Sequence, residues 1–439
     1  MVTTSSVAAH VQDQVVEDHA KVGQEAHDDD QQKQLNAGAL FVLKSKGSWV
    51  HCAYHLTTSI VGPDLLSLPY AFAFLGWTTG IFCLVIGASV TFYSYNLISL
   101  VLEHYAQLGH RHFRFRDLAH DILGPKWCWY FVGPIQFLVC YGAVVASILL
   151  GGQCMKSIYL LSSPNGSMKL YEFVIIFGCL MLVLAQIPSF HSLRHINLVS
   201  MLLGLAYSVC ATAACVYIGN SSKGSQKDYS LKSSTATVAA PVKGKMFKGL
   251  SVCYAVVTTT SFSVAISGYW AFGNKAEGLI LSNFLDDGKP LIPKWLIFMT
   301  NVFTMFQLSA VGVVYLQPTN EVLETTFADP TRNELSARNL IPRLISRSLS
   351  VMLATAIAAM LPFFGDINSV IGAFGFIPLD FVLPAVLFNL TFKPSKRSPI
   401  YWLNITIAVV FSVLGIIGAV AAIRQISLDA KTYKLFANV

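Results

Sequence analysis

The sequence predicts an all-α polytopic membrane protein, and three observations support this class. Hydrophobic side chains make up 54% of the 439 residues and charged ones only 12%, well below the ~25% usual in soluble domains. Apolar runs recur along the chain, and about 20 residues of helix cross the hydrocarbon core of a bilayer. The net charge of +7 is expected in the loops, as in membrane proteins generally, so it does not indicate a nucleic-acid partner.

Ten apolar runs are separated by polar connections. We expect membrane helices, in chain order, near 54–77, 79–103, 129–151, 170–188, 196–218, 250–272, 292–316, 343–363, 367–390 and 400–423. Five of them fall within 48–218 and five within 247–424. The polar residues 1–47 are expected to form a disordered tail, and residues 425–439 a C-terminal tail.

The first run, Tyr54–Trp77, is interrupted by Gly62-Pro63 and Pro69. A proline within a helix removes one amide donor and crowds the carbonyl one turn earlier, so backbone groups just before the break lose their helical partners. Lipid offers no replacement, and such breaks are therefore tolerated mainly where the helix lines a protein-enclosed cavity. A purely structural proline kink is the alternative, because Gly and Pro are common in membrane helices.

Basic residues in the connections orient the first half of the chain. The connection 104–127 carries four Lys or Arg residues, whereas 74–79 carries none. The positive-inside rule therefore predicts that the N-terminus is cytoplasmic.

No pattern in the sequence indicates an enzyme or a metal site. The nine cysteines are scattered, with no CxxC pair, and we interpret them as small buried hydrophobes. No His cluster has metal-ligand spacing, and no Walker or GxSxG motif is present. We therefore expect no enzyme activity, no cofactor and no metal.

Several blocks of the sequence are long and specific enough to compare with known families. They include SIVGPDLLSLPYAF (59–72), QIPSFHSLRHIN (186–197), AISGYWAFGN (265–274) and AAMLPFFGDINSVIGAFGFIPLDFVLP (358–384). In these blocks the chain resembles the plant amino acid/auxin permeases, and within them the proton-coupled GABA transporters. The resemblance implies a fold like that of the sodium-coupled leucine transporter: eleven membrane helices, the first ten in two inverted repeats, with substrate between the broken first and sixth helices.

One departure from that family concerns its sixth helix. Nothing within 219–246 is long or apolar enough to span a membrane, so we expect a polar loop there, with both ends on one face, and about ten helices instead of eleven. Simple alternation would then put the bases of 317–342 and 391–399 outside, against the positive-inside rule. The second half thus keeps the orientation signals of an eleven-helix protein, and we infer that a segment was lost.

The backbone freed near the first break is the expected substrate site. Amides at the positive end of a half-helix can bind a substrate carboxylate without another side-chain charge. We assign this role to Ser59, Ile60, Val61 and Gly62, with ordinary packing as the alternative. Tyr141 is a further candidate because the resembling fold turns its third helix toward the substrate, although buried tyrosines are often held by structural hydrogen bonds.

Two carboxylates fall within the apolar runs. Asp64 directly follows the break, and an intramembrane carboxylate is costly enough to be a functional candidate. We predict that it couples transport to protons; capping of the helix that restarts after the break is the alternative. Asp380 is interpreted as structural, either pairing across helices or capping a turn.

Together with the resemblance, these features predict a secondary active transporter that imports GABA and related small neutral amino acids with protons across the plasma membrane. Its partners would be the amino acid, protons and the lipid bilayer. The main alternative is a truncated, non-transporting relative. A heptahelical receptor or a channel would be membrane-bound as well, but neither class predicts a broken first helix.

Overall fold

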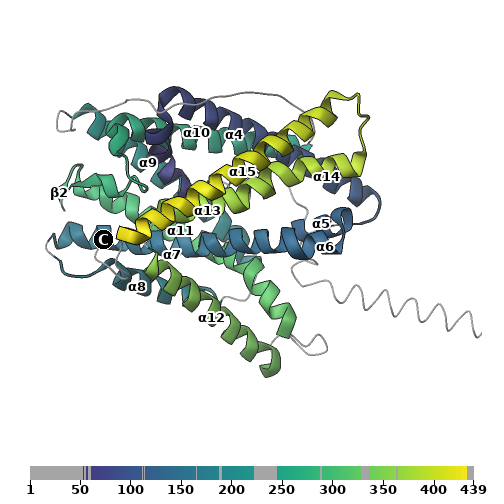
Figure 1. The fold of residues 1–439 in the computed structure, drawn as a ribbon. Coiled ribbons are helices and arrows are strands. Elements are labelled where there is room, and N and C mark those ends of the chain that lie inside the picture. Colours follow the sequence, from purple (N-terminus) through teal and green to yellow (C-terminus); the bar gives the residue numbers. More distant parts are fainter. Residues whose placement is uncertain are drawn as a thin grey trace, which may run out of the picture. The chain divides into compact units, whose positions relative to one another are not determined.

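The computed structural model describes residues 53, 56–57 and 61–432, apart from 111, 113, 165, 187–189, 222–244, 287–288, 328–335 and 362–363. These residues form long helices and one short hairpin (Figure 1). The expected tail 1–47 and most of the expected polar loop 219–246 lie outside the described residues.

The elements up to residue 220 come from the first half of the chain. They are the 3-10 helix η1 (Pro63–Ser67), α4 (Leu68–Gln107), α5 (Phe115–Leu123), α6 (Pro125–Trp127), the π-helix η2 (Cys128–Val132), α7 (Gly133–Ser162), α8 (Leu170–Leu184) and α9 (Phe190–Asn220).

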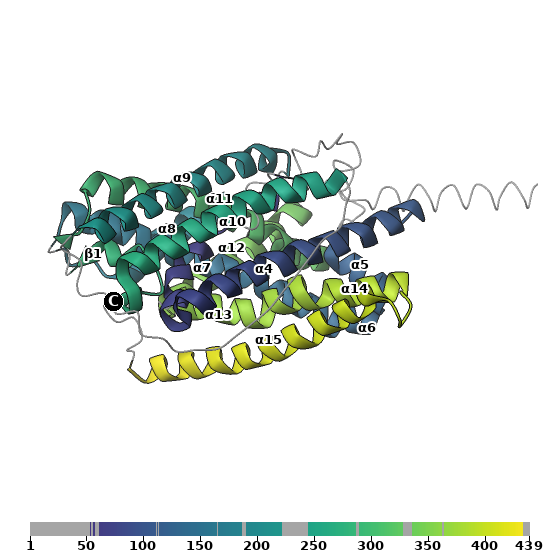
Figure 2. The ribbon, with the colours of Figure 1, turned by 90° about the horizontal axis from the view of Figure 1, so that it is seen from above.

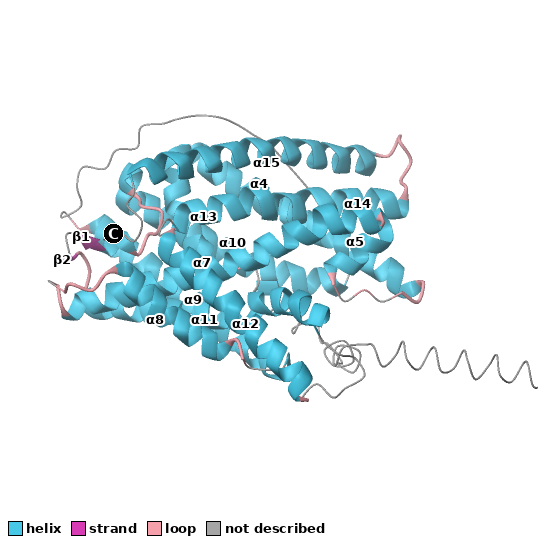
Figure 3. Cartoon of the chain, turned by 60° about the horizontal axis from the view of Figure 1, so that its bottom comes forward, coloured by secondary structure: helices cyan, strands magenta, loops and turns pink. Residues whose placement is uncertain are grey.

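The elements from residue 245 onward form the second half. They are α10 (Lys245–Phe272), the 3-10 helices η3 (Gly273–Lys275) and η4 (Ser282–Phe284), β1 (Leu285–Asp286), β2 (Lys289–Pro290), α11 (Lys294–Phe327), α12 (Ala337–Met360), α13 (Phe364–Ile371), the π-helix η5 (Gly372–Val382), α14 (Leu383–Phe392) and α15 (Pro399–Thr432). Figure 3 shows how strongly helix dominates this part of the chain, and β1 and β2 are its short antiparallel hairpin.

Eight helical segments of the described chain are long and apolar enough to cross a membrane, and α8 is a shorter apolar helix. Each of the ten runs expected from hydropathy overlaps a helix of the structure. Two of those runs share one segment, Asp64–Gln107. Many large apolar side chains on the outer helices remain exposed, for example Ile416 and Val420 on α15 and Ile345 and Leu349 on α12. Exposed apolar surface of this extent is typical of a lipid-facing protein.

Two glycines shape the first part of the bundle. Gly62 has extended backbone (φ −90°, ψ 172°) and is followed by the 3-10 helix η1, so the chain is not helical at the break that the sequence predicts. Within α4, Gly76 has φ 73° and ψ 178°, a left-handed conformation that favours glycine because a side chain would be strained there. The turn at Gly76 separates the first two expected helices.

Helices α7, α8, α11 and α12 pack against one another, and α9 lies between α11 and α10. The contact of α7 with α8 depends on small residues: a side chain at Gly151 would meet the Phe177 ring, and one at Gly152 would meet Val174. Such close approach is the usual way in which membrane helices gain packing energy, since lipid removes most of the hydrophobic drive between them. This part of the bundle is a rigid wall for the site below.

Helices α9 and α10 lie side by side (Figure 2) and run in the same direction. Gly219, near the end of α9, lies against the ring of Trp270, near the end of α10, and Cys215 lies close to Ser267 one turn earlier on both helices. At 1.5 Å per residue, Lys245 lies about 38 Å back along α10 from Trp270. The end of α9 and the start of α10 are therefore at opposite ends of the bundle. This differs from the expectation that both ends of 219–246 lie on one face.

The connection from α10 to α11 contains the β1–β2 hairpin and packs onto the second part of the broken helix. The Ile280 amide donates a hydrogen bond to the Leu66 carbonyl (3.0 Å). A Cβ at Gly278 would lie 3.6 Å from the Gly365 Cα at the start of α13. We call this the hairpin end of the bundle, and the end where α5 lies the α5 end.

Candidate functional site

The break at Gly62 is held by side chains from two other helices. The Val61 amide donates to Thr57 O at 2.7 Å, which completes the helix before the break. The Val61 carbonyl accepts a hydrogen bond from Gln307 Nε2 of α11 at 3.2 Å, and the Gly62 carbonyl accepts one from the Tyr207 hydroxyl of α9 at 2.9 Å. Both donor side chains are fully buried. Carbonyls that lost their helical partners are thus satisfied inside the protein, as a low-dielectric membrane interior requires.

A glycine on α9 lets this helix approach the break. A Cβ at Gly204 would lie 3.6 Å from Val61 Cγ1 and 3.8 Å from the Val61 carbonyl oxygen. A Cβ alone would fit at van der Waals distance, but a larger side chain would displace the carbonyl or Gln307. The position of the break is therefore fixed from two sides, by α9 and by α11.

Two cavities are stacked along the bundle at the level of the break. The α5-side cavity, about 470 Å³, is lined among others by Ser94, Tyr95 and Phe115. The hairpin-side cavity, about 390 Å³, is lined among others by Tyr70 and Gly365. Both volumes lie in the range of small-molecule sites.

The residues of α7 establish the order of the two cavities. Gln136, Val139 and Cys140 line the α5-side cavity, and Ala143, Ala146 and Ser147, further along the same helix, line the hairpin-side cavity. Because α7 begins at the α5 end, the two cavities follow one another along the axis of the bundle.

Asp64 lies where the two cavities meet. It lines both of them, together with Tyr315 and Phe376. Gly62 lines the hairpin-side cavity, and a Cβ at Gly62 would be 3.5 Å from Asp64 Oδ2. The carboxylate therefore lies directly beside the break. Asp380 lines the α5-side cavity, where the Tyr95 hydroxyl donates to its Oδ1 at 3.5 Å.

The structure brings together some of the residues expected from the sequence and not others. Gly62 and Asp64 lie at the break and line the cavities. Val61 lies at the break but is buried in the core, lines neither cavity, and its amide donates to Thr57 O. Ser59 and Ile60 lie outside the described residues. Tyr141 lies elsewhere on α7: its hydroxyl donates to the Ser350 carbonyl of α12 at 3.0 Å, and its ring stacks on Phe137. In the described part of the chain it lines neither cavity.

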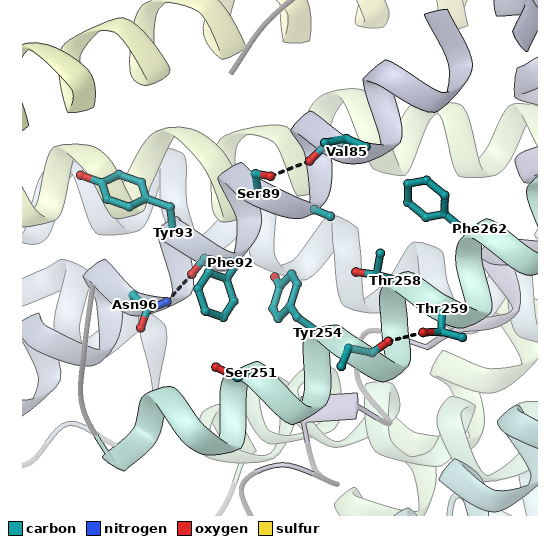
Figure 4. Close-up of a pocket in the computed structure, with 12 residues that line it drawn as sticks. Val85, Ser89, Phe92, Tyr93, Asn96, Ser251, Tyr254, Thr258, Thr259 and Phe262 are labelled. Carbon is teal, nitrogen blue, oxygen red and sulfur yellow. Dashed lines mark hydrogen bonds between the residues drawn. The ribbon is translucent and has the colours of Figure 1, made fainter. Parts of the chain in front are cut away.

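A third cavity, of about 590 Å³, is a groove between α4 and α10 (Figure 4). Several of its polar side chains bond back to their own helix: Ser89 Oγ to the Val85 carbonyl (2.7 Å), Asn96 Nδ2 to the Phe92 carbonyl (2.7 Å) and Thr259 Oγ1 to the Ala255 carbonyl (2.7 Å). Bonded in this way, they present little that could recognise a polar ligand. We call this cavity the α4–α10 groove.

Sequence reasoning did not single out Tyr207, Gln307, Ser94 or Tyr315. Each is a polar residue within an apolar run, and a buried polar group needs a partner. That signal could have marked them as partners of a broken backbone or as cavity residues. It could not have shown which of these two roles each residue has, because the role depends on how the helices pack.

The comparisons with known proteins agree with this architecture. The family model described as transmembrane amino acid transporter protein matches residues 45–240 and 235–426. The chain belongs to the transmembrane amino acid transporter family. This transporter is 61% identical over 434 residues to GABA transporter 1 of Arabidopsis thaliana, with 92% of this chain and 96% of that protein covered. It is 28% identical over 443 residues to Lysine histidine transporter-like 1 of the same plant, with 93% and 94% covered.

Among solved structures, the transporter is similar to Mhp1, a nucleobase-cation-symport-1 family transporter, in a closed conformation with bromovinylhydantoin bound. The similarity covers 90% of this chain and 95% of Mhp1, with 12% sequence identity and a TM-score of 0.48.

Proposed function

We propose that this amino acid transporter imports GABA and related small neutral amino acids together with protons across the plasma membrane, with its N-terminus in the cytoplasm. The observation that carries the substrate is the 61% identity to a GABA transporter over most of both chains. The broken helix beside two stacked cavities supports a transport site at Gly62. In this proposal the substrate carboxylate binds to the backbone amides of Ser59–Gly62 other than that of Val61, which donates to Thr57 O.

Proton coupling in this proposal follows from the position of Asp64. A substrate carboxylate at the break would lie next to the Asp64 carboxylate, which is 3.5 Å from the position of a Cβ on Gly62. Two negative charges at such a distance repel strongly in a poorly polarisable environment. Asp64 therefore takes up a proton when the substrate binds and gives it up when the substrate leaves, so the two move together.

The fold we propose is the inverted-repeat fold of the sodium-coupled leucine transporter, without its sixth helix. The parallel course of α9 and α10 supports a lost crossing, because one crossing between them would join the end of α9 to the start of α10. The two segments that match the family model also meet at 235–240. The alignment to GABA transporter 1 runs over 434 residues although it takes in 92% of this 439-residue chain, so it includes positions that this chain lacks.

A truncated, non-transporting relative is the second candidate. The parallel course of α9 and α10, which supports a lost crossing, also favours it. If the residues between α9 and α10 do not cross as a helix, the second half inserts against its loop charges. The chain would then be retained and degraded before it reaches the cell surface. Against this candidate stands the match to 96% of the length of GABA transporter 1.

Uptake of radiolabelled GABA by cells expressing this chain tests the proposal. We expect saturable uptake that a protonophore abolishes and that survives removal of sodium. Asp64→Asn should bind GABA but lose the response to the proton gradient, whereas Asp286→Asn, a carboxylate change at an exposed position of β1, should behave as wild type. Uptake that needs sodium and ignores the protonophore would contradict proton coupling.

A matched chain with an apolar helix inserted at Ser233 separates the two candidates. Uptake by both chains supports transport by the unmodified protein. Uptake and surface delivery by the insertion chain alone would establish the truncated candidate. Tags at Ser221 and Lys245, read from each side of the membrane, test the parallel course of α9 and α10: we expect them on opposite faces.

A further inference from the structure

Asp380 is an intramembrane carboxylate that the proposed cycle leaves without a role. It lies in the π-helix η5, which contains Pro378, and π-helical turns often occur at functional sites. One face of this segment points into the α5-side cavity, since Phe376 and Leu379 line the cavity together with Asp380. The side chain is therefore presented to the cavity and not to lipid.

The α5-side cavity is acidic. Of the residues described as lining it, two are carboxylates, Asp64 and Asp380, and none is Lys, Arg or His. The only hydrogen bond described for Asp380 comes from the uncharged Tyr95 hydroxyl, at the long distance of 3.5 Å. A carboxylate within the membrane is costly unless a cation or strong donor faces it. A cationic group of a ligand would meet that need.

A second feature of the same cavity points to a ligand independently. Ser94 also lines the cavity, and its side chain is only 1% exposed. Its Oγ has no hydrogen-bond partner among the described residues. Buried hydroxyls nearly always have a partner, so a polar ligand group in this cavity of about 470 Å³ would complete the site.

We propose that Asp380 binds the ammonium group of the substrate, and that this makes the transporter select amino acids whose two charges are far apart. The inference rests on the proposed function and deepens it. The substrate carboxylate lies at Gly62 in the hairpin-side cavity, and the ammonium group extends past Asp64 and Tyr315 into the α5-side cavity. Tyr315 lines both cavities and lies within electrostatic reach of both carboxylates.

The geometry assigns the ammonium group to Asp380 and not to Asp64. Asp64 lies beside the break, where the substrate carboxylate binds, and it is the proton acceptor of the cycle. Asp380 lies one cavity further toward the α5 end. An α-amino acid carries both charges on one carbon, whereas an ω-amino acid separates them by a short methylene chain and so fits two partners that lie in successive cavities better.

Competition against radiolabelled GABA bound to the purified full-length chain tests this inference without requiring transport. The competitors are glycine, β-alanine, GABA and butyrate, which has the carboxylate but no ammonium group. For the wild type we expect affinity to rise from glycine through β-alanine to GABA. Asp380→Asn should weaken GABA by about 30-fold or more, since one partner of a buried charge pair is removed, and should leave butyrate unchanged.

Two further variants keep the test decisive if Asp380→Asn folds poorly. Asp380→Glu keeps the charge but extends it by one methylene into the cavity, so the preference should shift from GABA toward β-alanine. Asp286→Asn, at an exposed position of β1, is the matched control and should leave the order of affinities unchanged.

The possible outcomes separate this inference from the function on which it rests. If the wild type does not bind GABA, the proposed substrate and the role of Asp380 are both overturned. If the wild type binds GABA and Asp380→Asn keeps the same order of affinities, the role of Asp380 alone is overturned. A loss of GABA and butyrate binding together, without a shift in Asp380→Glu, would assign Asp380 a structural role and also overturn it.

Discussion

The break at Gly62 and the α4–α10 groove both interrupt the packing of the bundle, but the polar groups in the two places have different hydrogen-bond partners. At the break, the Val61 carbonyl accepts a hydrogen bond from Gln307 and the Gly62 carbonyl one from Tyr207, both donors from other helices. In the groove, of about 590 Å³, side chains such as Ser89 and Thr259 donate to carbonyls of their own helices instead. The comparison shows how the helices hold one another: α9 and α11 hydrogen-bond to the backbone of the break, whereas these groove side chains do not join α4 to α10.

The largest effect is expected from Gly204→Leu, which enlarges a residue of α9 that lies against the break. The new side chain would push on the Val61 carbonyl and on Gln307, and overpacking of this kind costs about 1–3 kcal/mol. Thermal unfolding of the purified protein should shift to lower temperature, and GABA binding should be lost. Gly204→Ala is the control and should be mild, because its Cβ fits at 3.6 Å. A stable, binding-competent Gly204→Leu protein would contradict the close approach.

Gln307→Leu should have the next largest effect. It leaves the Val61 carbonyl without its donor, and an unpaired buried acceptor costs about 1–3 kcal/mol. Part of this loss is offset, because Gln307 Oε1 has no partner among the described residues and is removed at the same time. The free energy of unfolding in mild detergent would measure the net cost. An increase in stability would mean that the bond to Val61 contributes nothing.

Tyr207→Phe should cost less, about 0.5–1.5 kcal/mol for a single hydrogen bond, because the Gly62 carbonyl also accepts a longer bond from the Leu65 amide at 3.4 Å. Tyr141→Phe is a matched control, since it removes a hydroxyl bond of similar length to the Ser350 carbonyl. Both variants should lose similar stability, but only Tyr207→Phe should weaken GABA binding. Equal loss of binding in both would restore Tyr141 as a site residue.

The smallest effect is expected in the α4–α10 groove. Ala88→Leu enlarges a side chain that lines the α4–α10 groove, and the groove has room for the added atoms. Substitutions that neither clash nor unpair a group usually stay within about 0.5 kcal/mol. An unchanged melting temperature is therefore expected, and a large destabilisation would show that the groove is filled in the folded protein.

The sequence predicted the helices better than their packing. The positions of the helices follow from the lengths of the apolar runs, which can be determined from consecutive residues of the sequence. The turn at Gly76, for example, falls between the first two expected runs. The break at Gly62 was also predictable, because Gly-Pro acts on the local backbone. The partners of the break were not: Tyr207 and Gln307 are 145 and 246 residues away from the carbonyls they bind, and only the folded bundle brings them together.

The roles of individual polar residues were least predictable. Tyr141 was a reasonable candidate for a cavity residue, but its position around α7 directs it to α12, while Val139 and Cys140 face the cavity. Asp380 was interpreted as structural, and its bond to Tyr95 does pair it across helices. Its place in the same cavity as Asp64 depends on the relative rotation of η5 and η1, which hydropathy does not encode.

The meeting of two cavities at Asp64, Tyr315 and Phe376 also has an electrical consequence. When water fills the α5-side cavity from one end of the bundle and the hairpin-side cavity from the other, the insulating layer is thinnest at these three residues, and the membrane voltage falls most steeply there. An elementary charge that crosses gains about 2.3 kcal/mol for each 100 mV. A zwitterionic amino acid has no net charge and gains nothing from the voltage. In the proposed cycle the field therefore acts on the proton at Asp64, and through it a neutral solute can be accumulated by an electrical force.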